Sequence, residues 1–91
     1  MSISIKKRTG DVFVVTVADS ITTTHTVTVT DQTLTDLTDD NATKTQLLEF
    51  SFHFLLDREP NTSILSSFDI NVISKYFSDY KDEVRRWCDA G

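Results

Sequence analysis

Polar and apolar residues alternate through most of the first 30 positions, the period of a strand with one buried face. Short turns at Gly10 and at Asp19-Ser20 separate three such segments. Because short connections favour antiparallel pairing of neighbours, the pattern predicts a three-stranded antiparallel β-meander over residues 2–30. Its predicted inner face carries Ile3, Ile5, Phe13, Val15, Val17, Val27 and Val29, with His25 beside the last two.

The third segment, residues 22–30, places a threonine at every second position. This threonine set is predicted to face outward, and Val12 and Val14 of the preceding segment project to the same face. The outer strands of a meander are also its edges. Lys6-Lys7-Arg8 protects the first edge, but few charges protect the threonine strand. We therefore expect that a partner, or a second copy, can add at this edge.

From residue 31 onward the period becomes helical. Thr30 or Asp31 is predicted to cap a short helix around Leu34 and Leu37. Thr43, with Gln46 three residues later, matches a capping box and introduces the next helix.

Residues 47–56 contain three phenylalanines and four leucines, too many for one face of a surface helix. This helix is therefore predicted to be buried on most sides. It should end near Arg58, because Pro60 disfavours helical geometry at Glu59.

Two further helices complete the pattern. Asp69 is predicted to cap the first and Ser78 the second. Their apolar positions are Ile70, Val72, Ile73, Tyr76 and Phe77 in the first, and Tyr80, Val84, Trp87 and Cys88 in the second. The chain is thus predicted to be one α+β domain over residues 1–91, with the meander (2–30) packed against a helical part (31–90).

The composition of the chain limits the binding partners and the cellular compartments that we expect. The net charge of −5 argues against binding to nucleic acid or to an anionic membrane, both of which attract positive surfaces. A single cysteine, Cys88, cannot form an internal disulfide and fits a reducing compartment. No run of 18 apolar residues is present, so no membrane span is predicted. We expect a cytoplasmic monomer or homodimer.

Several stretches match a recurring pattern. They are Thr23-Thr24-His25-Thr26-Val27, Ser51-Phe52, the run over residues 55–65, Phe68-Asp69, Ile73, and Tyr76-Phe77-Ser78-Asp79-Tyr80. On these residues the chain resembles a family of short, uncharacterised bacterial proteins of unknown function, and it departs from them at Ser78, where the family tends to have proline. The resemblance covers nearly the whole chain. It implies a single cytoplasmic domain and transfers no catalytic residue.

The polar segment over residues 57–63 is the densest polar cluster beside the core. Arg58 can present a planar fork to a carboxylate or phosphate of a partner, assisted by free amides at Thr62 and Ser63. Alternatively, Arg58 bonds carbonyls at the end of the preceding helix, while Asn61 and Ser63 cap the next helical turn. The candidate binding residues are Arg58, Glu59, Asn61, Thr62, Ser63, Val12 and Val14.

Catalytic chemistry has less support. Glu49, His53 and Asp57 share one helix face at a spacing that suits a divalent metal, but the same spacing describes an ordinary solvated stripe. His25 as a general base needs a nucleophile and an orienting acid, and no serine or cysteine stands in such a context. Cys88 is expected to be a buried, unreactive thiol. We assign no catalytic residue, no metal ligand and no cofactor.

The leading expectation is a small non-enzymatic interaction or regulatory module with an unidentified protein partner. Binding is expected through the outer face and edge of the sheet, or through residues 58–63. The alternative is a small metal-dependent or His/acid-dependent enzyme that uses His25 or His53 with nearby acids.

Overall fold

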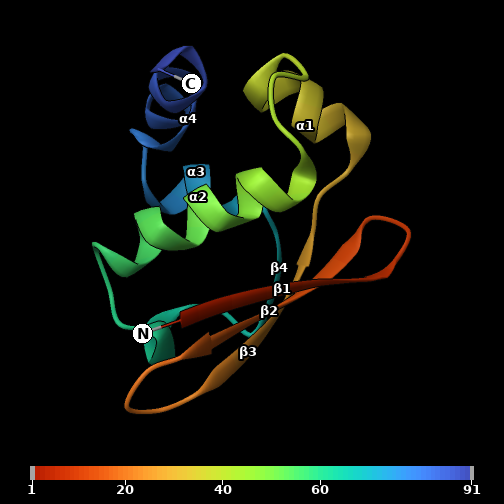
Figure 1. The fold of residues 1–91 in the computed structure, drawn as a ribbon. Helices are drawn as coiled ribbons and strands as arrows, with labels where there is room; N and C mark the ends of the chain where they lie inside the picture. The colour runs from red at the N-terminus through yellow and green to blue at the C-terminus, as the bar shows by residue number, and fades with distance from the viewer. Residues whose placement is uncertain (1, 91) are drawn as a thin grey trace.

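The strands and helices of this α+β domain lie largely where the hydrophobic pattern predicts them. The computed structural model describes residues 2–90. Its elements are β1 (Ser2–Thr9), β2 (Val12–Ala18), β3 (Thr23–Thr28), α1 (Asp31–Thr38), α2 (Lys44–Leu56), the 3-10 turn η1 (Asn61–Ser63), β4 (Ser67–Asp69), α3 (Val72–Tyr76) and α4 (Tyr80–Ala90). The helices lie on one side of the sheet, with α2 nearest to it and α1 and α4 beyond α2 (Figure 1).

The first three strands form the predicted antiparallel meander. Ile3 is opposite Val17 on β2, and Phe13 is opposite Val27 on β3. Gly10 turns the chain between β1 and β2 with a φ of 53°, a conformation that glycine adopts without strain. The predicted inner face is confirmed: its five members on β2, on β3 and just after β3 are buried, and the two isoleucines of β1 pack against them.

The sheet has a fourth strand, so the prediction of three strands is wrong on this point. β4 runs parallel to β3: the Thr26 amide donates to the Ser66 carbonyl (2.8 Å), and the Ile70 amide donates to the Thr28 carbonyl (3.0 Å). Because β4 covers β3 from Thr26 to Thr28, the expected free edge on the threonine strand is also wrong there. Three residues are too few to show a strand period, so the pattern could not reveal β4.

β4 also changes how the following helices begin. Asp69 was predicted to cap a helix, but it ends β4; its carboxylate accepts a hydrogen bond from the Asn71 amide (2.9 Å), and α3 starts at Val72. The prediction that Ser78 caps the last helix is likewise wrong. α4 begins at Tyr80, and its first backbone hydrogen bond runs from the Glu83 amide to the Asp79 carbonyl (3.0 Å).

The buried helix α2 begins as predicted. The Thr43 hydroxyl accepts from the Gln46 amide, and the Gln46 side chain accepts from the Thr43 amide, which is the complete capping box. The helix ends at Leu56, two residues before the expected Arg58. Its buried side chains face both the sheet and the outer helices: they are Leu47, Leu48, Ser51, Phe52, Phe54 and Leu55.

One hydrogen bond joins α2 to α4 inside the core. Ser51 donates to the Leu47 carbonyl (2.7 Å), so the hydroxyl of Tyr80 must be the donor in its 2.6 Å contact with Ser51 Oγ. Both side chains are fully buried. Burial raises the pKa of the Tyr80 phenol, and the bond to Ser51 opposes that rise only in part, so the phenol stays protonated.

Removing the central aromatic ring of α2 should destabilise the domain strongly. Phe52 is fully buried and its ring lies 5.4 Å from that of His25, so Phe52→Ala leaves a cavity between helix and sheet. We expect the free energy of unfolding to fall by about 3–5 kcal/mol in a urea titration. Tyr76→Ala, at a side chain 70% exposed, should change it by less than about 0.5 kcal/mol. Equal effects would contradict this packing.

The Ser51–Tyr80 hydrogen bond should be measurable as a coupling. Tyr80→Phe should lower the free energy of unfolding by about 1 kcal/mol, whereas Ser51→Ala, which leaves the buried Tyr80 hydroxyl without its acceptor, should cost up to about 3 kcal/mol. The double variant should lose less than the sum of the two losses, as urea denaturation can measure. Strict additivity would show that the two hydroxyls do not interact.

Candidate functional site

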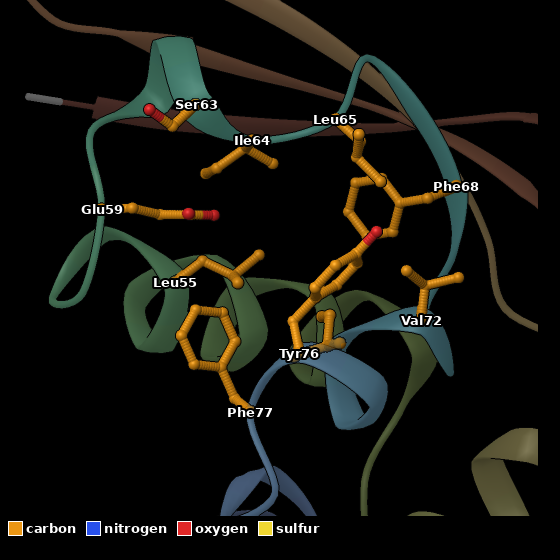
Figure 2. Close-up of a pocket in the computed structure, with 10 residues that line it drawn as sticks. Leu55, Glu59, Ser63, Ile64, Leu65, Phe68, Val72, Tyr76 and Phe77 are labelled. Atoms are coloured by element: carbon orange, nitrogen blue, oxygen red, sulfur yellow. The ribbon is translucent and has the colours of Figure 1, made fainter.

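A largely apolar pocket lies between the segment that follows α2 and the short helix α3 (Figure 2). Its volume is about 370 Å³. One side is formed by residues of α2, of η1 and of the chain leading into β4, and the other by α3 and the residue after it. The pocket is lined by Leu55, Glu59, Ser63, Ile64, Leu65, Phe68, Val72, Ile73, Tyr76 and Phe77.

A buried hydrogen bond from the sheet positions one wall of this pocket. His25 on β3 is 2% exposed, and its Nδ1 lies 2.8 Å from the Leu65 carbonyl oxygen. Because a carbonyl only accepts, Nδ1 carries a proton, and in the neutral tautomer Nε2 accepts from the Thr23 hydroxyl at 2.8 Å. His25 is therefore a hydrogen-bonded core histidine, in line with its predicted place beside the inner-face valines, and its ring is too buried to contact a substrate as a general base.

Asn61 extends the same network to the turn between β2 and β3. Its side-chain amide donates to the Ile21 carbonyl (2.7 Å) and to the Thr23 hydroxyl (3.0 Å), and the residue is 5% exposed. The expectation that Asn61 caps the following turn is wrong, because Pro60 occupies that position without a side-chain hydrogen bond. The network attaches η1 to the sheet.

Arg58 is occupied within the fold. Its guanidinium lies 3.6 Å from the centre of the Phe54 ring, donates to the Phe54 carbonyl (3.0 Å), and pairs with Asp79 (2.9 Å). The ring contact packs Arg58 against α2, the hydrogen bond satisfies one carbonyl near the end of α2, and the ion pair links this end to the start of α4. Arg58 is not a lining residue of the pocket. Its geometry matches the structural alternative considered for this residue.

The remaining candidate binding residues lie in three places. Glu59 and Ser63 line the pocket, while Thr62 is exposed outside its lining. Val12 and Val14 are half-buried on the far face of the sheet, opposite Thr28 and Thr26. No helix of residues 2–90 covers that face (Figure 1). The structure thus brings together two of the seven candidates.

Most of the pocket lining was missed from the sequence. Leu65 is 48% exposed and Tyr76 is 70% exposed, and with Ile21 they are the exposed large apolar side chains of the described residues. Tyr76 was expected in a core-facing stripe with Ile73 and Phe77. The structure shortens this helix to five residues, and so short a helix cannot bury apolar side chains on every side; the predicted cap at Asp69 implied a longer one.

The proposed metal face does not assemble into a ligand cluster. Glu49 and His53 line a second, shallower hollow of about 300 Å³ with Gln46, Phe50 and Trp87, and Asp57 is not part of it. Within residues 2–90, no group of three or more His, Cys, Asp or Glu side chains is placed to hold a metal ion.

Cys88 is partly buried on α4 and packs against the core. Burial raises the pKa of its thiol, and the nearby Asp89 carboxylate adds to this, so the reactive thiolate is disfavoured.

None of the helices in the described part of the chain is both long enough and apolar enough to cross a bilayer.

Comparison of the chain with protein-family models, with curated proteins and with solved structures finds no match. The resemblance to short bacterial proteins therefore stays a prediction.

Arg58→Ala tests the structural interpretation of this residue. It removes the hydrogen bond to Phe54, the stacking on its ring and the pair with Asp79, so we expect the free energy of unfolding to fall by about 2 kcal/mol. Arg86→Ala is the matched control, because Arg86 is 73% exposed in a surface pair with Glu83. That change should cost less than about 0.5 kcal/mol. If both variants melt like the parent, Arg58 has no structural role and is available to a partner.

Proposed function

We propose that this protein is a non-enzymatic interaction module that holds an apolar side chain of a partner polypeptide in the pocket beside α3. One observation carries the proposal: Leu65 and Tyr76, two large and well-exposed apolar side chains, stand at the rim of one apolar pocket. Single exposed apolar residues are ordinary on a protein surface, but their convergence on a concave site is typical of a binding site.

The composition of the pocket favours a polypeptide ligand. Tyrosine and other aromatic residues are enriched where proteins bind one another, and interface anchors fill pockets that exclude water around them. Phe68 and Phe77 line opposite sides of the pocket, and the Tyr76 ring extends from α3 towards Leu65 and Phe68 (Figure 2). The catalytic alternative lacks comparable support, since both ring nitrogens of His25 are engaged inside the core and, within residues 2–90, His53 is not part of a group of ligands placed to hold a metal ion.

The proposal also covers the cellular compartment of the module, its avoidance of nucleic acid and its oligomeric state. A cytoplasmic protein is in line with a single cysteine, and avoidance of nucleic acid is in line with a net charge of −5. The pocket is complete within one chain, so a monomer is sufficient for binding.

Selection of random peptides tests this proposal. A library of linear peptides displayed on phage is selected on the protein and counter-selected on Leu65→Glu, which places a charge on the apolar rim. We expect enriched peptides with a large apolar residue, whose affinity falls at least about tenfold on the variant, since a charge left in an apolar site costs more than about 1.4 kcal/mol. Binding can be measured by calorimetry.

Thr62→Glu is the control for this selection, because it adds the same charge to the neighbouring exposed chain outside the pocket lining. Both variants should melt close to the parent, since the Leu65 side chain is half-exposed and only its carbonyl bonds to His25. Failure to enrich any peptide that distinguishes Leu65→Glu from Thr62→Glu would refute a peptide-binding pocket.

A further inference from the structure

The pocket lining contains one acidic side chain, Glu59, and its carboxylate has no ion-pair partner within residues 2–90. Glu59 enters from the loop after α2 and points between Leu55 and Ile64 (Figure 2). Among residues 2–90, the ion pairs involve Asp11, Asp31, Asp79 and Glu83, and no described side chain donates a hydrogen bond to the Glu59 carboxylate.

The position of this carboxylate is set by the backbone. The Glu59 amide donates to the Leu55 carbonyl (2.9 Å), and Pro60 comes next with its restricted φ. Arg58, the neighbouring cation, is held by Phe54 and Asp79 and does not line the pocket. The pocket lining includes no lysine or arginine. Glu59 therefore faces the pocket as an uncompensated negative charge.

An apolar ligand that fills the pocket removes water from this carboxylate. A neutral ligand leaves the carboxylate poorly solvated, and an anionic ligand adds repulsion, so both lose affinity. A ligand that places an ammonium or guanidinium group next to its apolar anchor replaces the lost water with a charge-assisted hydrogen bond. The net charge of −5 favours the approach of the same cationic ligand from a distance.

We propose that the partner segment presents a large apolar residue together with a lysine or arginine, whose cation pairs with Glu59 while the apolar side chain packs against Phe68, Tyr76 and Phe77. This inference rests on the proposed function and names the chemical class of its ligand. Glu59 acts as the specificity-determining residue of the pocket.

Three probes of one shape and different charge test this assignment. Phenylbutylamine, phenylbutanol and phenylbutanoate are titrated separately into the ¹⁵N-labelled protein, and the amide shifts of Leu65, Phe68 and Tyr76 are followed by NMR. We expect the amine to bind at least about fivefold more tightly than the alcohol, and the carboxylate to bind most weakly.

Two variants separate a local pair from the effect of overall charge. Glu59→Gln should bring amine and alcohol within about twofold of each other. Glu49→Gln changes the net charge equally but lies in the other hollow, so it should leave the preference for the amine unchanged. Glu59 has no side-chain partner to lose, so Glu59→Gln should fold normally.

The outcomes distinguish the two proposals. If amine and alcohol bind the parent equally, with shifts at the three pocket residues, the pocket binds apolar groups and the role of Glu59 is overturned. A preference that survives Glu59→Gln also overturns it. If no probe shifts the pocket residues, the pocket does not bind apolar groups, and the ligand assignment fails together with the proposed function.

Discussion

The hydrogen bond between His25 and the Leu65 carbonyl is the interaction on which the arrangement of this molecule most depends. It joins the third strand to a segment 40 residues further along the chain. Thr23 and Asn61 continue the same chain of hydrogen bonds to the turn before that strand. Because these groups are mostly withdrawn from water, each bond is costly to leave unmade, and the network therefore selects one path for residues 61–65.

That path accounts for both unexpected features of the structure. Once Leu65 is held against β3, the next residues continue alongside the same strand and become β4. The chain then has to leave the sheet and turn into α3, and the space between this turn and the end of α2 becomes the pocket. The short β4 also covers β3 from Thr26 to Thr28, half of the strand, which limits edge-to-edge association there.

The core and the pocket differ in whether their polar side chains have hydrogen-bond partners within the protein. Inside the core every buried polar side-chain atom of the described residues has a hydrogen-bond partner, as Ser51 and Tyr80 illustrate. At the pocket, Glu59 stands beside apolar walls without one. The half-exposed Glu59 carboxylate makes no ion pair within residues 2–90, so it adds none to the stability of the fold and remains available to a ligand of the proposed kind.

The elements that could be predicted from the amino-acid sequence are those whose signal is local and repeated. The alternation in the first 30 residues predicted the meander and its inner face, and the Thr43 capping box with the apolar run after it predicted α2. Both signals extend over many consecutive positions, and both elements are found. The sequence also drew attention to Glu59 and Ser63, because a polar cluster beside a buried helix has to lie near the surface.

The remaining features depend on contacts between distant segments and emerge only in the folded chain. β4 is three residues long and forms because β3 lies beside it, so no periodic pattern of apolar residues in the sequence could predict it. The exposure of Tyr76 and Leu65 depends on the distance between α3 and the chain that leads into β4. This distance is set by the tertiary structure and cannot be predicted from the sequence of one segment alone. The pocket is made by that separation, and the residues that line it acquire a common role only when the chain has folded.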